Sequence, residues 1–255
     1  MSTVYPPEQA VESQFSAQTP PFPEIRIDES ERRKRYFELA LVLFAGLWYP
    51  ILGTIYVLRG GTFPVENALQ QQFRLLVIVA FELTALVVLF YVISRQRKAW
   101  RDLGLDFRWR DFASAIALLM VASLLSWTLY YVAQLAYAIA TGHYLYPKSL
   151  GGMLGFGISV WSLLFVCLNP FFEELIFRAY LISEIVALGG SRSLAIFLSI
   201  AVQVSYHLYQ GLANVIPITV MFLVFSIYYA RTKRVVPVIL AHLFCDVYAL
   251  LRGSI

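Results

Sequence analysis

The stretch LLVIVAFELTALVVLFYVI, residues 75–93, decides the class of fold. Glu82 is the one charged residue in this stretch, and Thr84 is the one uncharged residue that is neither apolar nor aromatic. A helix needs about 20 predominantly apolar residues to cross the hydrocarbon core of a bilayer. The stretch therefore predicts a membrane-spanning helix.

Further apolar segments lie on either side of it, at about 36–58, 112–140, 154–188, 193–210, 212–230 and 236–251. The chain is 59% hydrophobic and 14% charged, whereas a soluble domain carries about 25% charged residues. We predict an all-α, polytopic transmembrane bundle of about seven helices. The count becomes eight if the long fourth segment is split, and we expect a kink at Pro170 because proline cannot donate to the helical hydrogen bonds.

The charged residues predict the domain organisation and the topology. Residues 1–35 are expected to form a disordered cytoplasmic tail, and residues 36–255 a transmembrane domain. Lys and Arg cluster at 32–35, 95–110 and 231–234, which fits the cytoplasmic loops of a multi-pass protein. We therefore expect a plasma-membrane protein with its N-terminus inside and its C-terminus outside. Membrane lipids are the expected surroundings, and nucleic acid is excluded as a partner despite the net charge of +4.

The stretch NPFFEELIFRAYL, residues 169–181, places three ionisable groups in the fourth segment. Each costs about 2.5–3.5 kcal/mol at the centre of a membrane helix, so their presence suggests a function. Glu174 and Arg178 are four residues apart and can form an ion pair on one helix face. Glu173 is turned about 100° away and can point into a cavity.

Two histidines in later segments can complete a site with these groups. His207 lies in the fifth segment and His242 in the seventh, where Asp246 follows one turn later. Counted from the cytoplasmic ends, Glu173, His207 and His242 can meet at one depth. A carboxylate beside a histidine can take a proton from water, while a second histidine donates to an oxyanion.

Other assignments of the polar residues stay open. A divalent metal such as zinc could be held by Glu173, His207 and His242, or the site could work without a metal. Glu82 is interpreted first as a structural acid. Neither a GxSxG nor an HExxH motif occurs, which argues against a serine hydrolase elbow and a zincin helix.

At these residues the chain resembles the CPBP family of intramembrane endopeptidases, which includes the type II CAAX prenyl proteases and bacterial relatives. The EExxxR motif is matched by EELIFR, the FxxxH motif by QVSYH, and the HxxxN-or-D motif by HLFCD. QVSYH has Gln203 where phenylalanine is usual, a departure that we expect to affect local packing. The similarity covers about residues 112–251.

The resemblance implies roles for six residues. Glu173 and His207 would activate the attacking water, His242 with Asp246 would stabilise the oxyanion, and Glu174 with Arg178 would maintain the site. The expected enzyme is a CAAX prenyl protease-like endopeptidase that cleaves a hydrophobic or lipidated peptide within the membrane. The alternatives are a non-enzymatic immunity or scaffold protein and, with less support, a proton-coupled transporter.

Overall fold

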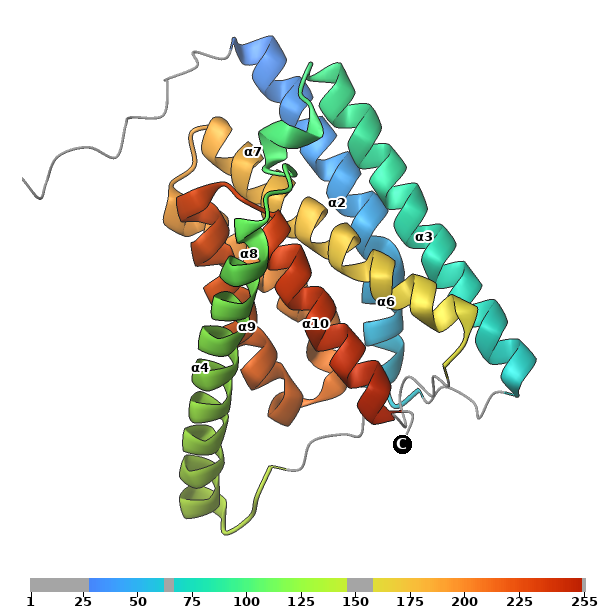
Figure 1. Cartoon of the computed structure of the whole chain (residues 1–255), viewed down its shortest axis with the longest axis vertical. Helices are drawn as coiled ribbons and strands as arrows, with labels where there is room; N and C mark the ends of the chain where they lie inside the picture. The colour runs from blue at the N-terminus through green and yellow to red at the C-terminus, as the bar shows by residue number, and fades with distance from the viewer. Residues whose placement is uncertain (1–27, 62–66, 146–157, 254–255) are drawn as a thin grey trace, which may run out of the picture.

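The computed structural model describes residues 28–61, 67–145 and 158–253, and within these ranges the chain is helical with no strand. All seven predicted apolar segments coincide with helices, which confirms the predicted fold class (Figure 1). The elements are α2 (Glu29–Leu58), α3 (Ala68–Arg95), η1 (Trp100–Leu103), α4 (Arg110–Thr141), α6 (Val160–Glu173), η2 (Glu174–Tyr180), α7 (Leu181–Ala187), α8 (Arg192–His207), η3 (Leu208–Gln210), α9 (Leu212–Thr232) and α10 (Val236–Gly253).

Five of these helices are long and apolar enough to cross a membrane: α2, α3, α4, α9 and the continuous Val160–Ala187. The fourth segment is thus one helix and is not split. α10 is a shorter apolar helix, and α8 has 16 residues. α2 begins at Glu29, where Asp28 caps it by accepting a hydrogen bond from the amide of Ser30. Residues 29–35 of the predicted tail are therefore helical, and residues 1–27 lie outside the described part of the chain.

The bundle is built from two groups of helices, which are joined by the contacts of α10 with α6 and of α8 with α9 (Figure 1). α3 packs against α2 and α6 on one side, while α4 packs against α9 and α10 on the other. α8 contacts α2, α7 and α9, and α10 contacts α6. The largest cluster of buried apolar residues surrounds η2, where Ile176, Phe177 and Tyr180 are fully buried. The segment with the EExxxR motif therefore lies in the centre of the bundle.

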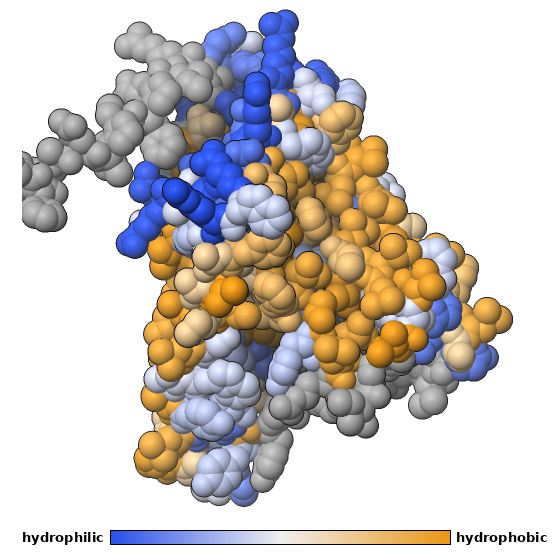
Figure 2. Space-filling view, in the orientation of Figure 1, coloured by the Kyte–Doolittle hydropathy of each residue, from blue (hydrophilic) through white to orange (hydrophobic). Residues whose placement is uncertain are grey.

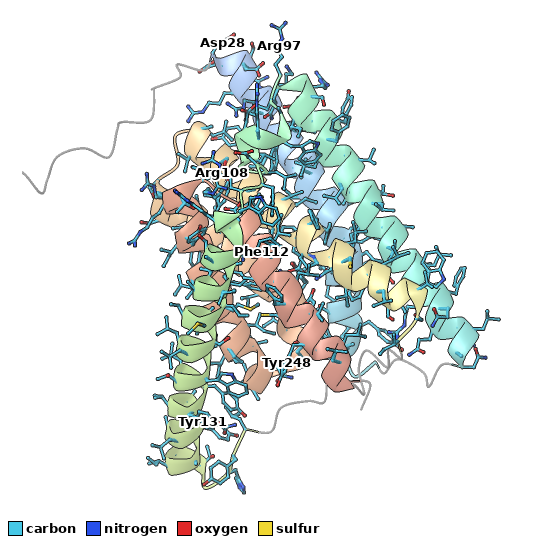
Figure 3. All side chains as sticks on the ribbon, in the orientation of Figure 1. Asp28, Arg97, Arg108, Phe112, Tyr131 and Tyr248 are labelled. Atoms are coloured by element: carbon cyan, nitrogen blue, oxygen red, sulfur yellow. The ribbon has the colours of Figure 1, made fainter. Side chains whose placement is uncertain are left out.

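The outer surface has the pattern of a membrane protein. Large apolar side chains such as Phe90, Met120 and Leu135 are exposed, and apolar residues cover the middle of the face in Figure 2. Hydrophilic residues gather at one end, where Figure 3 labels Asp28 and Arg97, while Tyr131 and Tyr248 lie toward the other. This distribution and the five long apolar helices identify a multi-pass membrane protein.

Ion pairs tie the helices together at the hydrophilic end. The buried carboxylate of Glu184 in α7 pairs with Arg35 of α2 at 2.6 Å and also contacts Lys98, which follows α3. Asp111 in α4 pairs with Arg234 at 2.7 Å. Because each pair joins segments distant in the sequence, these contacts fix the ends of the helices that carry the polar residues deeper in the bundle.

We expect Gly104→Ala to destabilise the fold. Gly104 has a φ of +84°, and a Cβ atom at this position would overlap the carbonyl oxygen of Lys233. Positive φ and steric overlap together should lower the free energy of unfolding by at least about 2 kcal/mol. The control is Gly53→Ala inside α2, where a Cβ would meet nothing within 4 Å and should stabilise by about 0.5–1 kcal/mol. Unfolding midpoints in detergent would measure both, and equal midpoints would contradict the prediction.

Lys233 should make stability depend on pH. Burial, with Arg192 and Lys98 nearby, lowers the pKa of Lys233 from its ordinary value of 10.5 to about 8. Between these values the unfolded chain binds a proton that the folded protein lacks, so stability rises as the pH rises from about 8 to 10.5. At pH 7 the Lys233→Met variant should therefore have a higher unfolding midpoint than the wild type. By pH 10 most of this difference in midpoint should be lost. A difference in midpoint of equal size at pH 7 and pH 10 would contradict the prediction.

Candidate active site

The backbone changes its winding at the EExxxR motif. α6 runs through Pro170 to Glu173, and residues Glu174–Tyr180 then form a π-helix before α7 begins. The irregularity expected at Pro170 thus appears four residues later, as a wider turn without a break in the helix. π-helical turns are rare and occur frequently at functional sites. Here the wider turn holds Glu174 and Arg178, which are both fully buried.

Arg178 is surrounded by acceptors and aromatic rings. Its guanidinium forms the ion pair with Glu174 that the spacing predicts. It also donates to Ser226 Oγ at 3.2 Å and to Gln203 Oε1 at 2.5 Å, and lies 5.3 Å and 5.6 Å from the ring centres of Phe222 and Phe225. A buried cation is stable only when it is paired and hydrogen-bonded, and this one is.

His242 is placed between two carboxyl groups. Its Nδ1 lies 2.7 Å from Glu174 Oε1, and its Nε2 lies 3.6 Å from Asp246 Oδ1. The carboxylate of Glu174 can only accept, so Nδ1 donates to it. The contact with Asp246 was expected from the spacing in α10, but the hydrogen bond to Glu174 was not. Asp246 also accepts a hydrogen bond from Asn169 Nδ2 at 3.2 Å.

Glu173 faces the other histidine. Its Oε1 lies 3.9 Å from His207 Nε2, and its side chain is 6% exposed. The Nδ1 of His207 accepts from Gln210 Nε2 at 2.9 Å, which places the proton of the neutral ring on Nε2. The ring packs against Tyr206 and Phe222, with ring centres 4.7 Å and 5.4 Å away. A gap of 3.9 Å is too long for a direct hydrogen bond and suits a bridging water.

The six residues named from the sequence therefore meet in two adjoining groups. One contains Glu174, Arg178, His242 and Asp246, and the other contains Glu173 and His207. Gln203 lies between them, because it contacts both Arg178 and Glu173. Glu82 of α3 is also buried and interacts electrostatically with Glu173 and Asp246, so it borders the site.

Sequence reasoning passed over Asn169 and Gln210 and treated Gln203 as a packing residue. The positions of Asn169 and Gln203 could have indicated a role. Asn169 precedes Glu173 by four residues, and Gln203 precedes His207 by the same spacing. Polar side chains one turn from ionisable groups in apolar helices are therefore candidates for the same site.

The donor geometry does not fit the metal centre considered from the sequence. Within the described ranges, no group of three His, Cys, Asp or Glu side chains is arranged to hold a metal ion. His242 directs its ring nitrogens toward Glu174 and Asp246, and does not join Glu173 and His207 around one point. The interpretation as a zinc metalloprotease gains no support from these residues.

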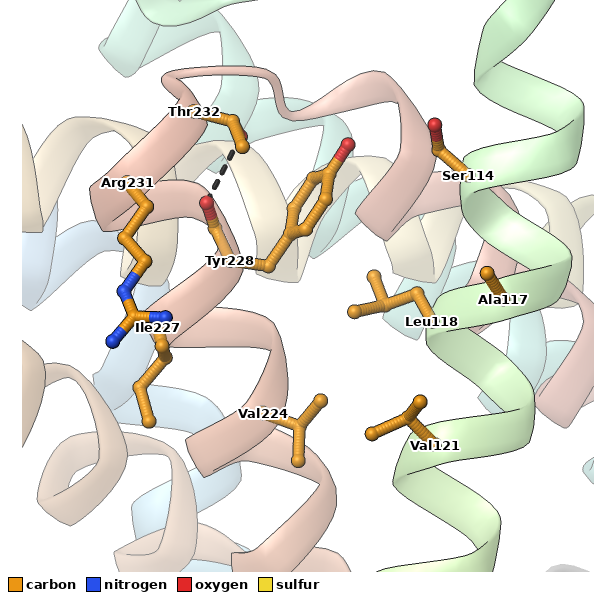
Figure 4. A pocket seen from close by; sticks show the side chains of 9 residues that line it. All are labelled: Ser114, Ala117, Leu118, Val121, Val224, Ile227, Tyr228, Arg231 and Thr232. Atoms are coloured by element: carbon orange, nitrogen blue, oxygen red, sulfur yellow. Dashed lines mark hydrogen bonds between the residues drawn. The ribbon is translucent and has the colours of Figure 1, made fainter.

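Two apolar grooves on the surface lie apart from the six residues. The groove between α4 and α9 has a volume of about 400 Å³ and is shown in Figure 4. Leu118, Val121 and Val224 form its apolar walls, and Arg231 and Thr232 lie at one end. The second, of about 300 Å³, is lined by residues of α2, α7 and α8. None of the six candidate residues lines either groove.

Arg178→Met should destabilise the protein strongly. The substitution leaves the buried Glu174 without its cation, and breaking a buried ion pair costs roughly 3–5 kcal/mol. Lys34→Met is the control because Lys34 pairs with Glu31 on the surface, where such a pair contributes about 0–1 kcal/mol. Denaturant unfolding of both variants would measure the difference, and a similar loss in the two would contradict the prediction.

Comparison with known proteins finds one family that part of the chain resembles. The family model Rce1-like, described as type II CAAX prenyl endopeptidase Rce1-like, matches residues 155–248. That range holds Glu173, Glu174, Arg178, His207, His242 and Asp246. No match is found among the curated proteins or among the solved structures. The match agrees with the resemblance seen in the three motifs, and it shows that residues 155–248 of this multi-pass membrane protein are similar to the type II CAAX prenyl endopeptidase family.

Proposed function

We propose that the protein hydrolyses a peptide bond in a membrane-associated substrate, using water that Glu173 activates as the base and that His207 holds in position. The observation that carries the proposal is the gap of 3.9 Å between Glu173 Oε1 and His207 Nε2. A water about 2.8 Å from both atoms could donate to the carboxylate while accepting from Nε2–H. That arrangement directs a remaining lone pair of the water toward a bound carbonyl carbon.

The proton transfers follow from this arrangement. Glu173 takes one proton as the water oxygen bonds to the carbonyl carbon, so a tetrahedral intermediate forms with a negative oxygen. When the intermediate collapses, the carbon–nitrogen bond breaks and the proton on Glu173 passes to the leaving amine. Glu173 is thereby returned to its carboxylate form, and the products are a carboxylic acid and an amine.

His242 is the proposed donor to the negative oxygen. Glu174 fixes the ring through Nδ1, and Asp246 lies beside Nε2. When the ring carries a proton on each nitrogen, Nε2–H can donate to an oxyanion, a type of interaction that is often worth 10²–10³-fold in rate. Arg178 keeps Glu174 in place, and Asn169 orients Asp246 from the opposite side.

The substrate class is proposed from the family and from the surroundings of the site. The exterior of the bundle is apolar, so a substrate with a hydrophobic or lipidated portion can approach from the bilayer. The family description names a CAAX prenyl endopeptidase, so we propose prenylated CAAX peptides as the substrate class. We also propose that the hydrophilic end faces the cytoplasm of a plasma-membrane protein, because the basic clusters of the sequence favour that orientation.

Glu173→Gln should remove turnover without removing the fold. Glutamine keeps the size of the side chain but cannot take the proton, so kcat should fall by about 10²–10⁴-fold. The matched control is Glu38→Gln, a substitution of another buried glutamate, whose Oε2 accepts from Gln96 outside the site. Cleavage of a prenylated CAAX peptide by the purified protein would be followed by mass spectrometry, with and without a chelator.

The outcomes separate the alternatives. If Glu173→Gln loses cleavage and Glu38→Gln keeps it, Glu173 is supported as the base. If the chelator also stops cleavage by the wild type, the reaction requires a metal. Unchanged turnover in a folded Glu173→Gln protein would contradict the mechanism. A folded wild-type protein that leaves the prenylated peptide and its non-prenylated counterpart intact would contradict the proposed substrate class.

A further inference from the structure

Gln203 in α8 is a fully buried amide whose orientation is fixed by its neighbours. Arg178 can only donate, so the oxygen of the amide must face the guanidinium, at 2.5 Å from Nη2. The amide nitrogen then points the other way, and it lies 3.4 Å from Glu173 Oε2. The two ends of one side chain thus contact the cation and the proposed base.

We infer that Gln203 is a positioning residue, which holds Glu173 in place by linking it to Arg178. The inference rests on the proposed role of Glu173. The amide occupies Oε2 of the carboxylate, and this leaves Oε1 directed at His207. Gln203 therefore selects the carboxylate oxygen that meets the water.

An amide can do this without pairing the base directly with the arginine. A guanidinium in contact with Glu173 would compete with water for the carboxylate and would stabilise its charged form. In the structure the guanidinium pairs with Glu174 instead, and the neutral amide extends from it to Glu173. The phenylalanine that is usual at this position of the motif has neither a donor nor an acceptor, so this link is a property of the present sequence.

Two substitutions separate the two ends of the amide. Gln203→Glu keeps an acceptor for Arg178 but places an oxygen where the amide nitrogen faced Glu173. Gln203→Leu removes both contacts. We expect kcat to fall by about 10²-fold in each, with KM within a factor of three, because a displaced catalytic group affects the chemical step more than binding. Unchanged kcat in both variants, or a rise in KM at constant kcat, would overturn the inference.

Ser199→Ala is the control for the loss of a buried polar group from the same helix. Ser199 is fully buried one turn before Gln203, and it donates to the carbonyl oxygen of Phe177 at 2.6 Å without contacting the six residues of the site. Its loss should lower the unfolding midpoint while kcat and KM stay close to the wild-type values. A fall in kcat equal to that of Gln203→Leu would show that any buried polar loss in α8 has the same effect, and would overturn the inference.

An infrared measurement tests the contact without using turnover. The carboxyl band that Glu173→Gln removes from the spectrum belongs to Glu173. That band should shift in Gln203→Leu and in Gln203→Glu, and should stay in place in Ser199→Ala. A band at the same frequency in all of these proteins would overturn the inference. This measurement needs no substrate. If the Glu173 band shifts as expected but the wild-type protein cleaves no peptide, the contact between Gln203 and Glu173 is supported and only the proposed function is contradicted.

Discussion

The structure depends on keeping one cation, Arg178, buried in the middle of a membrane bundle. The guanidinium is fully buried, so its partners must come from the protein. Glu174 comes from the same helix, Gln203 from α8, and Ser226 and two phenylalanine rings from α9. Three helices are therefore held together around one charge, and the arrangement of the other ionisable groups follows from it.

This constraint gives the two neighbouring glutamates different environments. Glu174 is committed to Arg178 and His242, so it is fully buried and has a structural task. Glu173 is the next residue, and its contacts are longer, at 3.4 Å from Gln203 and 3.9 Å from His207. A group that must take a proton and release it needs weaker contacts of this kind. The π-helix that begins at Glu174 separates the two side chains where the helix widens.

The sequence was sufficient for the helices and for the residues with the strongest chemistry. Runs of about 20 apolar residues leave few alternatives to membrane helices, and a charge in such a run is too costly to be accidental. The spacing of four residues between Glu174 and Arg178 gave the ion pair directly. The sequence could thus indicate which charged residues would gather inside the bundle, and their roles stay a prediction.

Contacts between helices were harder to predict, because helical periodicity says nothing of which partner a face will meet. The hydrogen bond from His242 to Glu174 joins residues 68 positions apart. Gln203 resembled a packing residue until its two neighbours were known, and Asn169 had no partner visible in its own helix. The π-helix is likewise a tertiary outcome, since nothing in EELIFR alone distinguishes it from an ordinary α-helical turn.

The short length of α8 has a consequence for the membrane around the protein. Sixteen residues extend about 24 Å, less than the hydrocarbon thickness of about 30 Å, and the helix ends at His207. Carbonyl groups at a helix end lack helical donors, and at this end the carbonyl oxygen of Tyr206 accepts instead from Thr54 Oγ1 of α2 at 2.8 Å. The bilayer beside α8 should accordingly be thinned, and lipids with longer chains would oppose this at a cost of fractions of a kcal/mol per Å.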